Sequence, residues 1–267
     1  MKRWLLASLV VIAAVLAFTF FRGATQPSSS QPSASSLPRT PDGRPDLNGV
    51  WQVLTTASWN IQDHAAQKGV PAGQGVVEGN DIPYQPWALA KKQENFKNRL
   101  TADLVEARGF LPGVPRIMYL PLPFQIVQTP KYVTMVFEYG HAVRIIYTDG
   151  TKHPEGHIDF WLGDSRGRWE GDTLVSDVIH FNGETWFDKA GNFHSEALHL
   201  VERLTLMGPD HINYEVTVED PKVFTRPWKM SMPLYRRKEP NVRILEYEAG
   251  ALIEEDAEKP EEQIKSR

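Results

Sequence analysis

The sequence predicts a mainly β protein, folded as an antiparallel up-and-down barrel or a strongly coiled sheet, with one helix that packs across it or closes an end. Three observations support this fold class. Beyond Pro115 the chain consists of short runs rich in β-branched and aromatic residues. Turn signals such as Asp149-Gly150 separate these runs. In residues 198–206, polar and apolar side chains alternate with the period of two that is typical of a strand.

The first predicted strand lies in GVWQVLTT, residues 49–56, and a Gly- and Gln-rich loop follows it to about residue 83. Pro86 opens the one predicted helix, because proline is tolerated in the first turn, where its missing N–H costs little. The apolar residues expected near one face of this helix are Leu89, Phe96, Leu100 and Leu104.

The rest of the chain is predicted to form hairpins. Their strands are expected in PFQIVQTP, KYVTMVFEYG, HAVRIIYTDG, GRWEGDTLVSDVIHF, HSEALHLVERLTL, HINYEVTVED, TRPWKMSMPLYR and VRILEYEAG. Roughly eight antiparallel strands with short connections are enough to close a calycin-like barrel. Barrels of this size often hold one small ligand.

An apolar run at residues 4–21 follows Lys2 and Arg3 and ends at Arg22. Its length is between that of a signal-peptide core and that of a membrane-spanning helix. Positive charge before the run directs the following chain across the membrane. We therefore expect a periplasmic protein tethered to the inner membrane by this run, or a secreted one if the signal is cleaved.

Composition divides the chain into four parts. Residues 1–22 are the signal anchor or signal peptide, and residues 23–44 are a flexible Ser/Pro-rich linker. Residues 45–252 are long enough for a β-barrel domain with a real core. Residues 253–267 form a charged tail.

The formal net charge is −4, and the chain has no cysteine. A mildly acidic protein without a basic stripe is a poor candidate for binding nucleic acid. The lack of cysteine excludes thiol catalysis, thiolate metal sites and disulfides. The sequence has no phosphate-binding loop, dinucleotide fingerprint or EF-hand, so no cofactor is expected.

Six motifs occur in order: PDLNGVW, PGVPRIM, PFQIVQTP, GRWEGDTLV, HSEALH-x-x-ER and DPK-x-x-TRPW. Together they resemble a large family of secreted bacterial proteins usually described only as hypothetical, and the resemblance covers residues 41–247. It implies no established activity. The family commonly has cysteines near Gly109 and Ala249, which implies a disulfide that this chain does without. It often has His for Asp164 and Gly for His180, so a site built on either residue would be peculiar to this chain.

Two acids are expected to face the barrel interior. Glu202 shares its parity with four leucines, and Asp177 shares its parity with Val175 and Ile179. A carboxylate among apolar neighbours is costly unless it is paired or protonated. Two such acids could perform acid–base catalysis, with burial raising one pKa. Alternatively, each is paired with an arginine, or a bulge returns Asp177 to solvent.

Arg144 lies among apolar residues and is expected to pair with Glu202 or to bind a ligand carboxylate or phosphate. His141 follows Gly140, where a turn or bulge could direct it inward, and Tyr147 belongs to the same segment. The preferred interpretation of Arg144 is a buried ion pair that braces the barrel, and a ligand contact is the alternative.

The histidines give a weaker indication. His194 and Glu196 would face the same side of a strand and could bind Zn²⁺ with His153 or His157 as a third ligand. Because this spacing is not diagnostic, no metal is expected. Most of these histidines are expected at the surface.

The preferred function is the binding of a small, mostly apolar or aromatic molecule inside the barrel, with Arg144 as the contact for an anionic group. Glu202 and His141 would supply further polar contacts. Trp186 and Asp188 lie in the loop NGETWFDKAGN and are expected at the barrel mouth.

Two alternatives stay open. One is a cofactor-free acid–base enzyme, an isomerase, hydratase or lyase, on the same barrel. In it, Glu202 or Asp177 would be the base, and His141 or His194 the acid. The other is a structural envelope module in which the inward charges only brace the fold.

Overall fold

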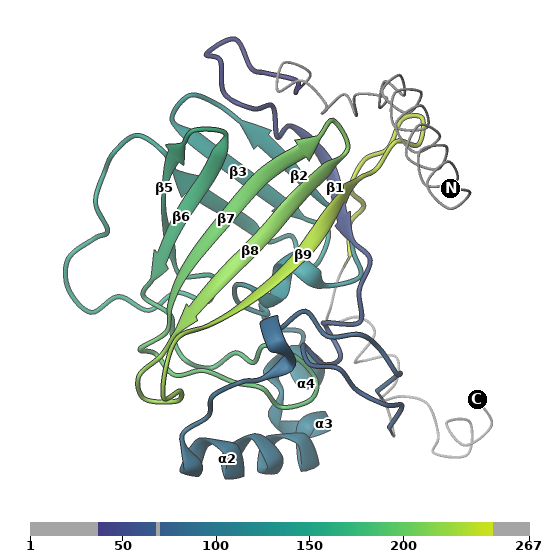
Figure 1. Ribbon diagram of the computed structural model, residues 1–267, viewed down its shortest axis with the longest axis vertical. Coiled ribbons are helices and arrows are strands. Elements are labelled where there is room, and N and C mark those ends of the chain that lie inside the picture. Colours follow the sequence, from purple (N-terminus) through teal and green to yellow (C-terminus); the bar gives the residue numbers. More distant parts are fainter. Residues whose placement is uncertain (1–36, 68–69, 248–267) are drawn as a thin grey trace, which may run out of the picture. The chain divides into compact units, whose positions relative to one another are not determined.

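The computed structural model describes residues 37–67 and 70–247 (Figure 1). In this part of the chain, strands β1 to β9 form one closed barrel, in which each strand pairs with the next and β9 pairs with β1. The predicted fold class is therefore confirmed. The predicted anchor, most of the predicted linker and the charged tail lie outside the described residues.

The strands alternate between buried and more exposed side chains, as expected for a barrel with a packed interior. In β7, Leu200, Glu202 and Leu204 are fully buried and the residues between them are not. The predicted inward face of this strand is confirmed. The strand bounds are β1 (Gly49–Val53), β2 (Phe124–Gln128), β3 (Tyr132–Phe137), β4 (Val143–Tyr147), β5 (Asp164–Glu170), β6 (Thr173–Ile179), β7 (His199–Gly208), β8 (His211–Glu219) and β9 (Trp228–Arg236).

One pairing departs from the predicted antiparallel order. β4 and β5 run parallel and pair at only two positions, Ile146 with Ser165 and Tyr147 with Arg166. Parallel strands need a long crossover, which residues 148–163 supply as the wide loop at the left of Figure 1. Gly167 permits the close approach of the two strands, because a Cβ there would lie 2.7 Å from Cγ2 of Ile146.

The strand predicted in VRILEYEAG does not form in its described part, residues 242–247. A single bridge joins Tyr247 to Tyr139, and Leu245 is 65% exposed. The barrel is already closed by the pairing of β9 with β1, so these residues have no free sheet edge to join.

The predicted helix at Pro86 is confirmed as α2 (Pro86–Lys97), but its predicted apolar face is wrong. Leu89 is 47% exposed, and the buried residues are Ala88 and Asn95. The helix packs through small and polar groups because its backbone approaches Gly191 closely. Further helical segments are the 3-10 helices η1 (Glu78–Asn80) and η2 (Arg116–Tyr119), and the short α3 (Arg99–Ala102) and α4 (Leu104–Arg108). Figure 1 shows α2, α3 and α4 beyond one end of the barrel.

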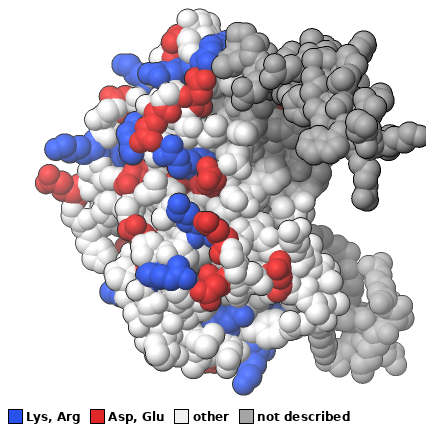
Figure 2. Space-filling model, in the orientation of Figure 1, with Lys and Arg blue, Asp and Glu red and all other residues white. Residues whose placement is uncertain are grey.

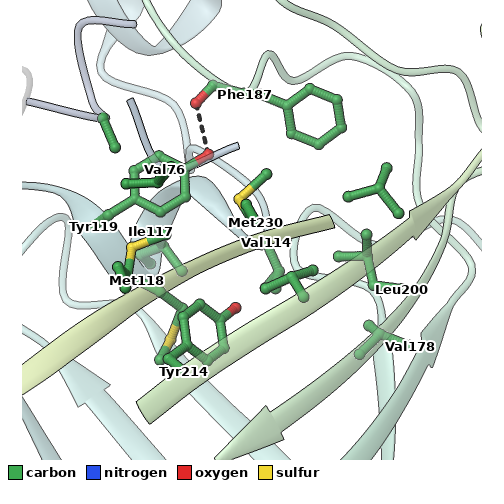
Figure 3. Packing of buried hydrophobic residues seen from close by; sticks show 14 of the residues in the cluster. Val76, Val114, Ile117, Met118, Tyr119, Val178, Phe187, Leu200, Tyr214 and Met230 are labelled. Atoms are coloured by element: carbon green, nitrogen blue, oxygen red, sulfur yellow. Dashed lines mark hydrogen bonds between the residues drawn. The ribbon is translucent and has the colours of Figure 1, made fainter. Parts of the chain in front are cut away.

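The barrel core is filled with side chains (Figure 3). All four residues of η2 are buried, and Met118 and Tyr119 belong to the same apolar cluster as Tyr214 of β8 and Met230 of β9. The hydroxyl of Tyr119 donates to the backbone carbonyl of Phe187 at 2.8 Å, the dashed line in Figure 3. Burying each large apolar side chain contributes roughly 1.5–3 kcal/mol, so a ligand at these positions would have to displace stabilising contacts.

Charged side chains of both signs are interspersed on the face shown in Figure 2. Arg203 of β7 pairs with Glu170 of β5 at 2.8 Å. Arg39 pairs with Asp172 at 2.8 Å, so contacts with the barrel begin before the domain boundary expected at residue 45. Among the described residues, no helix is long and apolar enough to cross a bilayer.

Candidate functional site

Arg144 and Glu202 form an ion pair inside the barrel, and both side chains are at most 2% exposed. Nη1 of Arg144 donates to Oε1 of Glu202 at 3.0 Å, and its Nη2 donates to Oε2. Nε and Nη2 also donate to Oγ of Ser165, at 3.1 and 3.0 Å. The hydroxyl of Tyr214 completes the group by donating to Oε1 of Glu202. The preferred interpretation of Arg144 as a partner of Glu202 is confirmed.

The buried charges in this group stabilise one another. Burial lowers the pKa of the Arg144 guanidinium, but the charge and hydrogen bonds of Glu202 outweigh burial and raise it overall. Burial and the charge of Glu202 raise the pKa of the Tyr214 hydroxyl well above its ordinary value. Because these groups satisfy one another, the arrangement favours a bracing role over an open anchor for an anion.

Asp177 does not join Glu202 in the interior, so its predicted inward orientation is wrong. Ser176 pairs with Glu202 across the sheet, whereas Asp177 pairs with Val201 on the outer face. The apolar pattern was misleading because Val175 and Ile179 share the parity of Asp177, whereas the inward parity of β6 belongs to Leu174, Ser176 and Val178. After the strand, the φ of 66° at His180 breaks the alternation, and Phe181 is buried.

His141 is exposed in the turn between β3 and β4, with a φ of 51°, and the prediction that it points inward is wrong. Tyr147 ends β4 on the outer face, where the guanidinium of Arg166 lies 4.5 Å from its ring centroid. The exposed position of His141 and the outer position of Tyr147 separate both residues from Glu202.

His194 and Glu196 lie before β7 and not on a strand, so they do not share the face on which the zinc alternative depended. His194 is buried, donates from Nδ1 to the carbonyl of Ser195 and is hydrogen-bonded through Nε2 to Thr185. Burial lowers the pKa of His194. Glu196 is exposed and pairs with Lys222. Within residues 37–67 and 70–247, no three His, Asp or Glu side chains are grouped to hold a metal ion.

Trp186 and Asp188 are buried, and their predicted place at the barrel mouth is wrong. Asp188 is fully buried and accepts hydrogen bonds from the backbone N–H groups of Ile61, Ala190 and Asn192 at 2.8, 2.9 and 3.1 Å. Burial raises the pKa of this carboxyl. It therefore organises the loop rather than facing a ligand.

A pocket of about 420 Å³ opens in the barrel wall where β4 and β5 separate, and we name it the lateral pocket. Its polar lining includes the buried Arg144 and Ser165, together with Asp159 and Asp164. Gly163 also lines it. Its remaining walls are apolar or aromatic: Leu111, Val143, Ile145, Tyr147, Phe160, Trp161 and Leu162.

The lateral pocket exists because β4 and β5 pair only at the end of β4. Val143 and Ile145 have no partner on β5 and are 53% and 39% exposed. Gly163 lets the opposite wall run close to β6, because a Cβ there would lie 2.7 Å from Cγ1 of Val178. Its φ of 67° also favours glycine.

Aromatic rings concentrate at this opening. Trp161 and Phe110 meet edge to face, with ring centroids 5.3 Å apart. Phe110 and Phe160 are 39% and 38% exposed. Exposed apolar side chains gathered around a concavity, rather than scattered singly, are typical of binding sites, which makes this opening the candidate site.

A series of imidazoles and carboxylates begins at Asp164, which lines the lateral pocket, and we name it the imidazole–carboxylate chain. Asp164 lies 2.6 Å from Nδ1 of His153, whose Nε2 lies 2.9 Å from Asp177. The other oxygen of Asp177 lies 2.9 Å from Nε2 of His199, and Nδ1 of His199 lies 3.3 Å from Glu219. Sequence reasoning missed this chain, because its members come from four strands and a loop without a characteristic spacing.

The members of this chain shift one another's ionisation. Burial raises the pKa of Asp177, but hydrogen bonds from His199 and His153 outweigh it and lower the pKa overall. Burial lowers the pKa of His199, but the hydrogen bond and charge of Asp177 outweigh it and raise the pKa overall. The pKa of Asp164 is likewise lowered overall, because Arg166 and His153 outweigh its burial.

No protein-family model and no curated protein matches this chain. The resemblance of its motifs to a family of secreted bacterial proteins stays a prediction.

Proposed function

We propose that the protein binds a small, neutral, mostly apolar or aromatic molecule in the lateral pocket. The observation that carries this proposal is the concentration of exposed apolar side chains, including Val143, Ile145 and Phe160, around an opening that polar residues also line. Its volume of about 420 Å³ lies within the range of roughly 300–1,000 Å³ that is usual for small-molecule pockets.

A neutral ligand fits the charges at this opening better than an anionic one. The guanidinium of Arg144 is bound to Glu202 and Ser165. The guanidinium of Arg166 is bound to Asp164 at 2.7 and 2.8 Å. An anionic ligand would therefore have to compete with a carboxylate for either cation, at a cost in desolvation.

The proposal is tested with the neutral fluorescent probe N-phenyl-1-naphthylamine, whose emission rises in an apolar site. Wild-type protein is expected to bind it saturably, and Trp161→Ala to weaken binding by roughly tenfold, which corresponds to the loss of one aromatic contact. Val143→Ser should weaken binding too, because Val143 lines the pocket.

Val127→Ser is the matched control, since Val127 is a similarly exposed strand valine on β2, at 42%, and does not line the pocket. Equal binding by wild type, Trp161→Ala and Val143→Ser would refute the site. A binding loss of the same size in Val127→Ser would show that the effect is not local.

The cellular location is a separate proposal that rests on residues 1–22. We propose that the barrel works in the periplasm, tethered by residues 4–21. A fusion of the full chain to a reporter enzyme that is active only outside the cytoplasm tests this. Reporter activity in the membrane fraction is expected, and an inactive reporter would contradict the proposal.

A further inference from the structure

The β4–β5 connection, residues 148–163, supplies one wall of the lateral pocket through its residues 159–163. A bridge between Phe160 and Phe181 holds one part of it. His153 holds another part through Asp164 and Asp177, and Nε2 of His180 donates to the carbonyl of Pro154 at 3.1 Å. The position of this wall therefore depends in part on the bonds of His153.

Both imidazoles of the imidazole–carboxylate chain lie between two carboxylates. His153 lies between Asp164 and Asp177, and His199 lies between Asp177 and Glu219. An ionised carboxylate only accepts hydrogen bonds, and a neutral imidazole carries one N–H. A histidine between two carboxylates must therefore donate both of its hydrogen bonds. It has the two N–H groups that this requires only when it is protonated.

Charged groups from several elements surround the two imidazoles. On the strands, Asp164, Asp177 and Glu219 face the two histidines, and Arg166 binds Asp164. His180 lies beside His153, with ring centroids 6.2 Å apart. On the connection itself, the charged or titratable residues are Asp149, Lys152, Glu155, His157 and Asp159.

If each of the two imidazolium rings lost one proton, Asp164, Asp177 and Glu219 would face a single positive charge, the guanidinium of Arg166. The repulsion would act between β5, β6 and the connection. Among the bonds that hold the pocket wall, those of His153 would then weaken first, because only they depend on a proton.

We propose that the imidazole–carboxylate chain is a proton-controlled latch on the β4–β5 connection, so that the lateral pocket holds its ligand at mildly acidic pH and releases it as the pH rises. This inference rests on the proposed function, because the pocket that it regulates is the same one. The direction of this pH dependence agrees with the pKa of His199, which burial lowers but which Asp177 and Glu219 raise overall.

The test measures the Kd of N-phenyl-1-naphthylamine at pH values from about 6 to about 8.5, a range in which the probe is neutral. The Kd of wild type is expected to rise by roughly three- to tenfold, which corresponds to about half to one pKa unit of coupling. In His153→Gln, which keeps a hydrogen-bond donor but cannot gain the proton, the Kd should be independent of pH. His211→Gln is the control, because His211 is an exposed histidine whose ring meets Tyr235, outside the chain.

A second measurement separates the latch from ligand binding. Hydrogen exchange of residues 148–163 without ligand, corrected for the intrinsic effect of pH, should increase with pH in wild type and in His211→Gln but not in His153→Gln. If the probe binds with a Kd independent of pH, the latch is refuted and the pocket proposal stands. If no probe binds at any pH, the pocket proposal fails, and equal exchange in wild type and His153→Gln would refute the latch as well.

Discussion

Arg144 on β4 and Glu202 on β7 lie 58 positions apart in the chain and meet inside the barrel through two N–H···O contacts. The pair also binds Ser165 of β5 and Tyr214 of β8, so it links four strands. Because Arg144 lies on β4 and its partner Ser165 on β5, these contacts cross the weak β4–β5 pairing. The ion pair therefore holds β4 to the rest of the barrel where few backbone bonds do so.

We predict that Glu202→Gln lowers the free energy of unfolding by roughly 3–5 kcal/mol, because it leaves the buried Arg144 guanidinium without a counter-charge. Urea denaturation measures the change. Glu215→Gln on the outer face of β8 is the control and should change stability by less than about 0.5 kcal/mol. A Glu202→Gln protein as stable as wild type would show that the pair does not brace the barrel.

We predict that Asp188→Ala is strongly destabilising. Three backbone N–H groups that are bonded to this carboxylate would lose their acceptor in a buried loop. Each orphaned donor costs about 1–3 kcal/mol, and Asp188→Asn should cost less because its amide oxygen still accepts. Thermal unfolding of the two variants checks this order. Equal melting temperatures for Asp188→Ala and wild type would contradict it.

Alternation with period two is a local property, and it correctly predicted strand β7 and the inward position of Glu202. The arginine partner also followed from local chemistry, since Arg144 lies among apolar residues. The same rule failed at Asp177, because apolar residues occur at both parities of β6: Val175 and Ile179 share the parity of Asp177, whereas Leu174 and Val178 share that of Ser176. The pairing of Ser176 with Glu202 decides which parity faces inward, and that pairing is not a local property.

The lateral pocket and the imidazole–carboxylate chain could not be predicted from sequence. Asp149-Gly150 has the chemistry of a hairpin turn, yet the chain continues into a crossover and returns as the parallel strand β5. Strand direction here depends on how residues 148–163 pack, which is a long-range property. His153 and Asp177 come together only through that crossover.

The pH dependence of stability follows from the pair of His199 and Asp177. The raised pKa of His199 gives stability that is complete below its ordinary value of 6.5 and is lost as pH rises through the folded value. The lowered pKa of Asp177 gives stability that is complete above its ordinary value of 3.8 and is lost as pH falls through the folded value. We therefore predict that the stability difference between wild type and Asp177→Asn is largest between these two ordinary values.

Urea denaturation of wild type and Asp177→Asn across this pH range measures the difference. This stability difference should become smaller at pH values below the ordinary pKa of Asp177 and above that of His199. A difference that keeps growing as pH rises past the imidazole range would contradict the assignment of His199 as the partner that carries the positive charge.

Gly163→Ala is expected to disturb the lateral pocket directly. The added Cβ would lie 2.7 Å from Cγ1 of Val178 and 2.9 Å from Cζ of Phe181, in a residue with a φ of 67°. Gly171→Ala provides the matched control, because Gly171 has a φ of 59° but a Cβ there would meet no atom within 4 Å. Backbone strain alone costs roughly 1–2 kcal/mol, which both variants share.

The difference between these two variants therefore reports the steric contact below the pocket wall. We expect Gly163→Ala to be less stable than Gly171→Ala in urea, and to lose N-phenyl-1-naphthylamine binding that Gly171→Ala retains. Gly163 lines the lateral pocket and Gly171 lies in the turn between β5 and β6, away from it. If both variants bind the probe as wild type does, the wall formed by residues 159–163 does not contact the ligand, which would contradict the placement of the ligand in the lateral pocket.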